Sequence, residues 1–184
     1  MKNRSSIRNM TMAAVCVALC VVLPIAFHSI PDAGSVFLPM HIPVLICGMI
    51  CGWPYGLLCG LMGPLVSSAL TGMPPIAFLP AMMVECGTYG LVSGLMLKYV
   101  HTRRTYADLY IALVVAMIAG RVVSGIAKAL IFTPGLALSA WVTASFVTAL
   151  PGIIIQLVFL PSVVCTLMKA KVIPQRYAKG QITA

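Results

Sequence analysis

The sequence predicts an all-α integral membrane protein, a bundle of six transmembrane helices with both termini in the cytoplasm. Apolar side chains make up 61% of the 184 residues and charged ones only 8%, whereas about 25% of the residues in soluble domains are charged. Residues 33–84 and 129–168 form two runs of 52 and 40 residues without Asp, Glu, Lys or Arg. Uncharged runs of this length, without strict two-residue alternation, favour transmembrane helices over barrel strands.

The individual elements follow from the apolar runs and from the prolines and glycines between them. We expect one membrane domain over residues 1–184, with spans at about 10–27, 41–52, 55–71, 78–97, 109–132 and 141–168. The connecting segments are outer loops at 28–40, 72–77 and 133–140, and a basic cytoplasmic tail at 169–184.

The first span also has the basic flank of a cleaved signal peptide. Its 18 residues exceed the usual signal-peptide core of about 7–15 residues, however, and no A-x-A site follows. We therefore interpret residues 10–27 as a transmembrane helix.

Prolines and glycines interrupt two of the apolar runs. The sequence Gly52-Trp53-Pro54-Tyr55-Gly56 should divide residues 41–70 into two helices, the first of which rises only ~18 Å and is too short to cross alone. In the last span we expect a bend or a break near Pro151 and a frayed, irregular end after Pro161.

The basic residues indicate the orientation, because Lys and Arg collect on the cytoplasmic side. With six crossings, ten of the twelve fall in cytoplasmic segments and none in the outer loops: Lys2, Arg4, Arg8, Lys98, Arg103, Arg104, Lys169, Lys171, Arg176 and Lys179. Residues 41–70 therefore cross twice or re-enter without crossing, and the charge count leaves both arrangements open.

Several function classes are excluded by what the sequence lacks. It has no glycine loop followed by Lys and Ser/Thr, which excludes ATP hydrolysis by that route. The net charge of +9 comes from short flanks of apolar segments, so we expect no nucleic-acid partner. The seven cysteines lie in apolar stretches without a CxxC pair, so we interpret them as core residues and expect neither a metal nor a cofactor.

Small residues recur at four-residue spacing, which favours close helix packing in membranes. The glycines of this kind are Gly48, Gly52, Gly56 and Gly60, with Gly90 and Gly94 in the fourth span. In the first span Ala14 and Ala18 form an A-x-x-x-A face.

Three ionisable residues lie within the expected spans: Glu85 in the fourth, Arg121 and Lys128 in the fifth. A cation at a helix centre costs about 2.5–3.5 kcal/mol to insert, so these side chains should face protein, water or ligand. Arg121 and Lys128 share one helix face with Ser124, because seven residues at about 100° each return to nearly the same direction.

Two interpretations of these charges remain open. In the first, Glu85 forms an ion pair that only fixes helix register. It can neutralise only one of the two cations, so the other stays unpaired. Alternatively, one acid and two bases bind an anionic or zwitterionic solute, with Arg121 as the carboxylate-binding group because its planar fork binds both oxygens. Weaker candidates for the same site are Tyr89, Gln156, His41, Trp141 and the loop residue Asp32.

The chain as a whole resembles the substrate-binding S components of the energy-coupling factor (ECF) transporters, which import vitamins into bacteria. The features that carry the resemblance are Ala14/Ala18, Met40-His41-Ile42-Pro43, Cys51-Gly52-Trp53-Pro54-Tyr55-Gly56-Leu57, Gly72-Met73-Pro74-Pro75, Ala119-Gly120-Arg121 and Pro151-Gly152-Ile153-Ile154.

The resemblance implies a six-helix subunit in the bacterial cell membrane that binds a vitamin near the outer surface. Its partners would be a transmembrane coupling subunit and two ATPase subunits, with Ala14 and Ala18 on the docking face. Pantothenate, nicotinate or a folate would suit the unpaired cation, while queuosine precursors, riboflavin and cobalamin stay open.

Two rival functions are a stand-alone secondary transporter or channel, with Glu85 and Arg121 as an ion relay, and an assembly subunit without a ligand. An enzyme is the least favoured class, because no Ser/His, paired Asp or His-rich constellation is present.

Overall fold

The computed structural model describes residues 2–26, 36–132, 138–173 and 177, and its regular elements are all helical. The α-helices are α1 (Lys2–Ala26), α3 (His41–Cys51), α4 (Trp53–Thr71), α5 (Leu79–Tyr99), α6 (Thr105–Ala127), α7 (Leu138–Val142) and α8 (Leu150–Lys169). Two π-helical segments, Lys128–Phe132 and Thr143–Thr148, continue α6 and join α7 to α8 respectively.

The division of residues 41–70 into two helices is confirmed, and a single glycine makes it. Gly52 adopts φ 90° and ψ 170°, a conformation that only glycine adopts readily. Helix α4 then begins directly with Trp53 and has a proline in its first turn, where the missing N–H has no helical partner in any case. The second helix therefore begins two residues earlier than expected.

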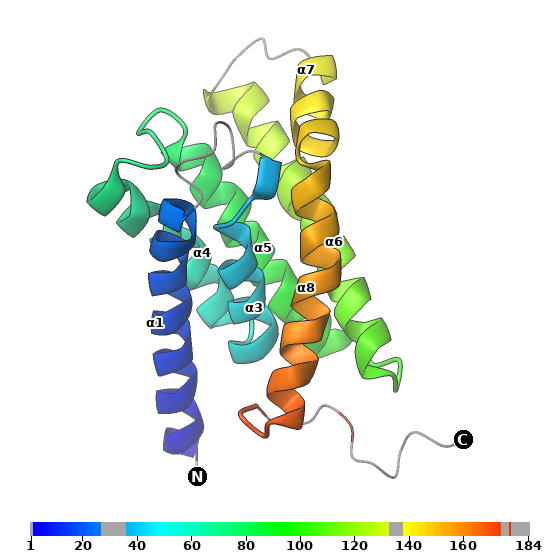
Figure 1. The fold of residues 1–184 in the computed structure, drawn as a ribbon. Helices are drawn as coiled ribbons and strands as arrows, with labels where there is room; N and C mark the ends of the chain where they lie inside the picture. Colours follow the sequence, from blue (N-terminus) through cyan, green and yellow to red (C-terminus); the bar gives the residue numbers. More distant parts are fainter. Residues whose placement is uncertain (1, 27–35, 133–137, 174–176, 178–184) are drawn as a thin grey trace.

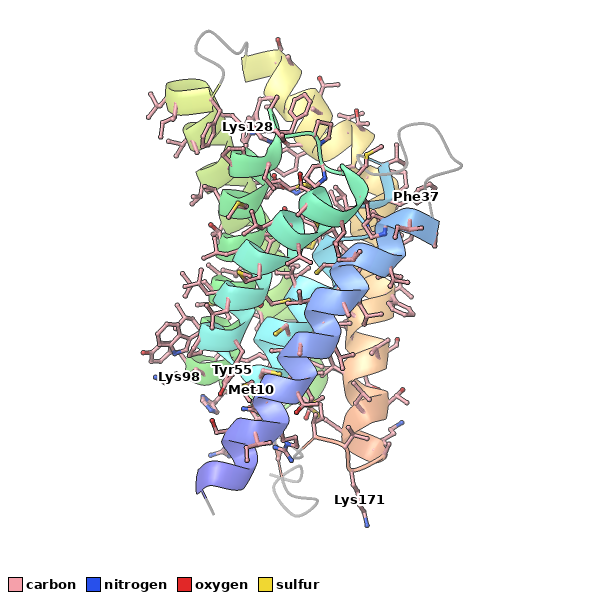
Figure 2. All side chains as sticks on the ribbon, turned by 90° about the vertical axis from the view of Figure 1, so that its left-hand side faces the viewer. Met10, Phe37, Tyr55, Lys98, Lys128 and Lys171 are labelled. Carbon is pink, nitrogen blue, oxygen red and sulfur yellow. The ribbon has the colours of Figure 1, made fainter. Side chains whose placement is uncertain are left out.

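The helices form a bundle with two chemically different ends. The first residues of α1 and the last residues of α8 lie at the same end (Figure 1). Lys98 and Lys171 also lie there, and we call it the basic end; Lys128 and Phe37 lie at the opposite end, which we call the site end (Figure 2). Tyr55, just after the Gly52 break, lies toward the basic end (Figure 2). Helices α3 and α4 thus form a hairpin whose turn points toward the basic end.

The expected close packing at glycines is confirmed between α5 and both arms of this hairpin. A Cβ built on Gly90 would lie 2.0 Å from the carbonyl oxygen of Gly56, and one on Gly60 would lie 2.3 Å from that of Cys86. Gly48 approaches the Gly90 carbonyl oxygen in the same way, at 2.4 Å. These helices therefore touch backbone to backbone, which no larger residue at the contacts would permit.

The seven cysteines are all buried and none forms a disulfide. The Cys20 thiol donates to the carbonyl oxygen of Met40 at 3.7 Å, and the Cys47 thiol donates to that of Tyr55 at 3.4 Å. Within the described residues no group of three or more His, Cys, Asp and Glu side chains is placed to hold a metal ion. The cysteines act here as small core residues, as expected.

Three helical segments of the described chain are long and apolar enough to cross a membrane: Ser6–Ala26, Thr105–Phe132 and Leu150–Lys169. The 19 and 21 residues of α4 and α5 rise ~28 and ~31 Å, close to the ~30 Å of a hydrocarbon core. Helix α3, with 11 residues, rises only ~16 Å. The count of six crossings stays a prediction.

The last expected span is divided into three pieces. The break near Pro151 is confirmed, because α8 begins at Leu150 after the π-helical segment Thr143–Thr148. The irregular end expected after Pro161 is wrong, since α8 continues through this buried proline to Lys169. Helices in apolar bundles tolerate an interior proline where neighbouring elements adjust to the missing hydrogen bond.

Candidate binding site

Glu85 on α5 is the centre of a polar network near the site end. Its Oε1 accepts a hydrogen bond from the Tyr89 hydroxyl at 3.1 Å, and its Oε2 accepts one from the Ser124 hydroxyl at 2.9 Å. Lys128 Nζ lies 3.5 Å from Oε2, and His41 Nε2 lies 3.6 Å from Oε1. One carboxylate thus ties together α3, α5, α6 and the π-helical segment after α6.

Helical spacing explains why these side chains meet. Glu85 and Tyr89 are four residues apart on α5, and Ser124 and Lys128 are four apart along α6 and its continuation, so each pair shares a face. The Tyr89 ring fits against α6 because position 120 is glycine: a Cβ there would lie 2.1 Å from the ring. The ring of buried His41 lies 5.0 Å from that of Tyr89, centroid to centroid.

Arg121 lies beside this network but has a different environment. Only 3% of it is exposed, and its Nε and Nη2 have no hydrogen-bond partner among the described residues. These two nitrogens lie on one edge of the guanidinium, the edge that forms two parallel hydrogen bonds with a carboxylate. A buried charge without acceptors is unfavourable, so this edge is suited to an anionic guest.

Of the two cations on α6 and its continuation, Glu85 pairs with Lys128 and not with Arg121. An ion pair that fixes helix register accounts for the contact between Glu85 and Lys128. It does not account for Arg121, which leaves a formal charge of +1 in the group.

Two aromatic residues cover the site from the segment before α8. The Phe146 ring lies 5.5 Å from the Arg121 Cζ, within the range of a cation–π interaction. Trp141 meets Phe146 edge to face, at 5.9 Å between centroids. Trp141 also packs on Gly125, where a Cβ would lie 2.4 Å from the indole. Trp141 and Phe146 thus form an aromatic wall beside Arg121, and a role of Trp141 in binding stays a prediction.

Phe146 is a site residue that the sequence did not indicate. In an ordinary α-helix, residues five apart point in different directions, so Trp141 and Phe146 would not be paired. The intervening backbone is π-helical, and its wider turn brings positions i and i+5 close to the same face. No sequence signal distinguishes this turn from an α-helix.

Gln156, a weaker candidate for the site, contacts the segment before α3. Its Nε2 donates to the carbonyl oxygen of Leu38 at 3.5 Å, and a role in binding stays a prediction. One turn earlier on α8, a Cβ on Gly152 would lie 2.6 Å from the Val36 carbonyl oxygen. Gln156 and Gly152 therefore hold residues 36–38, at the end of the first expected outer loop, against α8.

Asp32 is outside the described residues. Ala14 and Ala18 lie on an exposed face of α1, while Cys16 and Cys20 on the opposite face are buried in the bundle. The A-x-x-x-A face is therefore not used for packing within the described chain.

A family model described as "ECF transporter, substrate-specific component" matches residues 8–164. Comparisons with curated proteins and with solved structures gave no match.

Proposed function

Because the chain belongs to the substrate-specific components of the ECF transporters, we propose that it captures a micronutrient that carries a carboxylate. Membership of this family makes it a multi-pass membrane protein and a substrate-binding subunit of an importer, not an enzyme. The family association is with an energy-coupling module whose ATPases are separate chains.

The observation that carries the proposed substrate class is the buried edge of Arg121. Its Nε and Nη2 have no acceptor in the part of the chain that the structure describes, and the carboxylate of Glu85 is already engaged by Tyr89, Ser124 and Lys128. A carboxylate from the substrate would supply two charge-assisted hydrogen bonds and cancel the remaining positive charge.

The substrates that fit this description best are pantothenate, nicotinate and folate-like vitamins. A zwitterion also fits, with its carboxylate at Arg121 and its cation toward Glu85. The faces of Phe146 and Trp141 would cover the apolar part of the molecule, since aromatic side chains supply large contact areas at such sites.

The proposed orientation places the site end outside the cell and the basic end in the cytoplasm, with six crossings. The support is the position of Lys98 and Lys171 at one end and of the site at the other (Figure 2), together with the excess of basic residues in cytoplasmic segments of membrane proteins.

The direct test is to purify the chain together with its coupling and ATPase subunits and to identify by mass spectrometry the small molecule that is released on denaturation. We expect a vitamin-like molecule that carries a carboxylate. A neutral or purely cationic ligand in stoichiometric amount would refute the substrate class.

A titration of the purified chain with matched probes gives a second test. Pantothenate, nicotinate and folate would each be compared with the corresponding neutral amide. The acid that binds should do so at least about tenfold more tightly than its amide, which is about 1.4 kcal/mol. Equal affinities would contradict the role of Arg121 but not the family membership.

A further inference from the structure

The segment between α4 and α5, residues 72–78, exposes large apolar side chains; we call it the Ile76 loop. Ile76 is 82% exposed and Phe78 66%, and Leu70 at the end of α4 is 72% exposed. The loop projects from the side of the bundle on which α1 lies, away from α6 and α8 (Figure 1). No element of the described chain covers these side chains.

The charge pattern around the Ile76 loop is unusual for a water-exposed turn. It lies in the run of residues 33–84 that contains no Asp, Glu, Lys or Arg. The next ionisable residue along the chain, Glu85, faces the network inside the bundle. A turn in water commonly carries charged or strongly polar side chains, and this one presents none.

The carbonyl groups of the loop have partners on the preceding helix. Ser67 Oγ donates to the Met73 carbonyl oxygen at 2.7 Å, and Ser68 Oγ donates to that of Pro74 at 2.8 Å. The Pro75 carbonyl oxygen accepts from the backbone N–H groups of Phe78 and Leu79, at 2.9 and 3.1 Å. These acceptors therefore do not depend on water.

Most of the donors are either absent or paired. Pro74 and Pro75 have no backbone N–H, the Gly72 N–H donates to the Ser68 carbonyl oxygen at 2.9 Å, and the Met73 N–H donates to Thr71 Oγ1 at 3.2 Å. The N–H groups of Ile76 and Ala77 form no backbone hydrogen bond within the described residues and need partners at the headgroup level. Internal pairing of backbone groups is what irregular chain needs in order to leave water for lipid.

The length of α4 places the loop at a membrane boundary. Helix α4 begins at Trp53, next to the turn that points toward the basic end. Its 19 residues rise ~28 Å, and the hydrocarbon core is about 30 Å thick. Any tilt shortens this reach, so the loop falls at or slightly within the far edge of the hydrocarbon.

We propose that the Ile76 loop is inserted in the bilayer, at the boundary between headgroups and acyl chains, with Leu70, Ile76 and Phe78 in contact with lipid. The loop then anchors the site ends of α4 and α5 in the membrane. The gain comes from removing its apolar side chains from water, as for an interfacial helix. This inference does not depend on which substrate the chain binds.

Spin labelling tests the proposal on the full chain in phosphatidylcholine nanodiscs. A nitroxide would be attached in the Ile76→Cys variant, with Val158→Cys, on the exposed face of α8, as the lipid reference and His101→Cys as the water reference. Unsubstituted protein measures any labelling of the seven buried native cysteines. The readout is collision with oxygen, which concentrates in hydrocarbon, and with a water-soluble nickel chelate.

We expect the Ile76 label to resemble the Val158 label, with collisions with the nickel chelate reduced about fivefold or more relative to His101, because the chelate does not enter lipid. Nickel accessibility equal to that of His101 would show a loop in water and overturn the proposal. Low accessibility to both reagents would show a loop covered by protein and would overturn it as well. Phe78→Cys serves as the second position if Ile76→Cys does not fold.

Discussion

At the residue scale, the decisive feature is that Glu85 and Arg121 differ in what already surrounds them. The Glu85 oxygens have partners on four elements, whereas one edge of the Arg121 guanidinium has none among the described residues. We therefore expect Arg121→Gln to weaken ligand binding at least about tenfold, because the charge and the two parallel hydrogen bonds are lost together. Calorimetric titration with the identified ligand measures the effect.

The matched control is Arg103→Gln, the same chemical change in the exposed loop between α5 and α6. It should leave both affinity and thermal stability unchanged. Arg121→Gln protein that is folded and binds with unaltered affinity would remove Arg121 from the site.

Glu85→Gln separates an anionic from a zwitterionic ligand. The amide keeps the shape of the side chain but removes the charge opposite Lys128, which we expect to lower the free energy of unfolding by about 1–3 kcal/mol. An anionic ligand should bind the variant as well as, or more tightly than, the unsubstituted chain, since the formal charge of the group rises from +1 to +2. A loss of affinity would indicate that a ligand cation contacts Glu85. Thermal unfolding of the sample measures the change in stability, and titration of the same sample measures the change in ligand affinity.

The sequence was sufficient to single out the three charged residues in the expected spans. A charged side chain is costly in lipid unless it faces protein, water or a ligand. The sequence was not sufficient to assign the partners of these residues. Whether Glu85 pairs with Lys128 or with Arg121 depends on how α5 and α6 are rotated about their axes, and Phe146 enters the site only through a π-helical turn.

At the scale of the helices, backbone contact between α4 and α5 depends on glycine. A Cβ on Gly90 would lie 2.0 Å from the Gly56 carbonyl oxygen, a backbone atom that cannot move aside. We expect Gly90→Ala to lower the free energy of unfolding by about 1–3 kcal/mol through overpacking. Thermal unfolding of the purified variant checks this.

Gly87→Ala is the control on the same helix. Its Cβ would meet the end of the flexible Leu61 side chain at 3.3 Å, and alanine is the better helix former by about 1 kcal/mol. This variant should be as stable as the original chain or more so. Equal destabilisation by both substitutions would mean that the backbone contact is not the cause.

The exposed face of α1 carries a prediction about assembly. Ala14 and Ala18 are exposed although α1 packs on the bundle through Cys16 and Cys20, and small residues permit another helix to approach closely. Ala18→Trp should reduce co-purification of the coupling subunit severalfold while ligand binding is retained. Ile118→Trp, on an exposed position of α6, is the control and should have no effect.

Helix boundaries were predicted best from the sequence where a single glycine or proline determines the backbone conformation. Gly52 ends α3 because its conformation suits only glycine, and the break before α8 lies next to Pro151. Pro161 led to a wrong prediction for the opposite reason: its effect depends on neighbouring helices, which keep α8 continuous to Lys169. Tertiary contacts of this kind have no signature in a single segment.

At the scale of the whole molecule, the hairpin of α3 and α4 bears on the crossings that the charge count left open. Its turn points toward the basic end, since Tyr55 lies on the side of Lys98 rather than of Lys128 (Figure 2). Helix α4 alone is nearly as long as the hydrocarbon core is thick. Both facts favour two crossings over a segment that enters and leaves on the outer side.

A cysteine in place of Trp53, which is exposed next to the turn, should react with a membrane-impermeant maleimide in inside-out vesicles and not in intact cells. Ile131→Cys, exposed after α6 beside Lys128, should react from the outside and so controls for reagent access. Labelling of Trp53→Cys in intact cells would mean re-entry from the outer side, or an inverted orientation if Ile131→Cys is protected at the same time. The two variants together therefore decide both the crossing count and the direction in which the site faces.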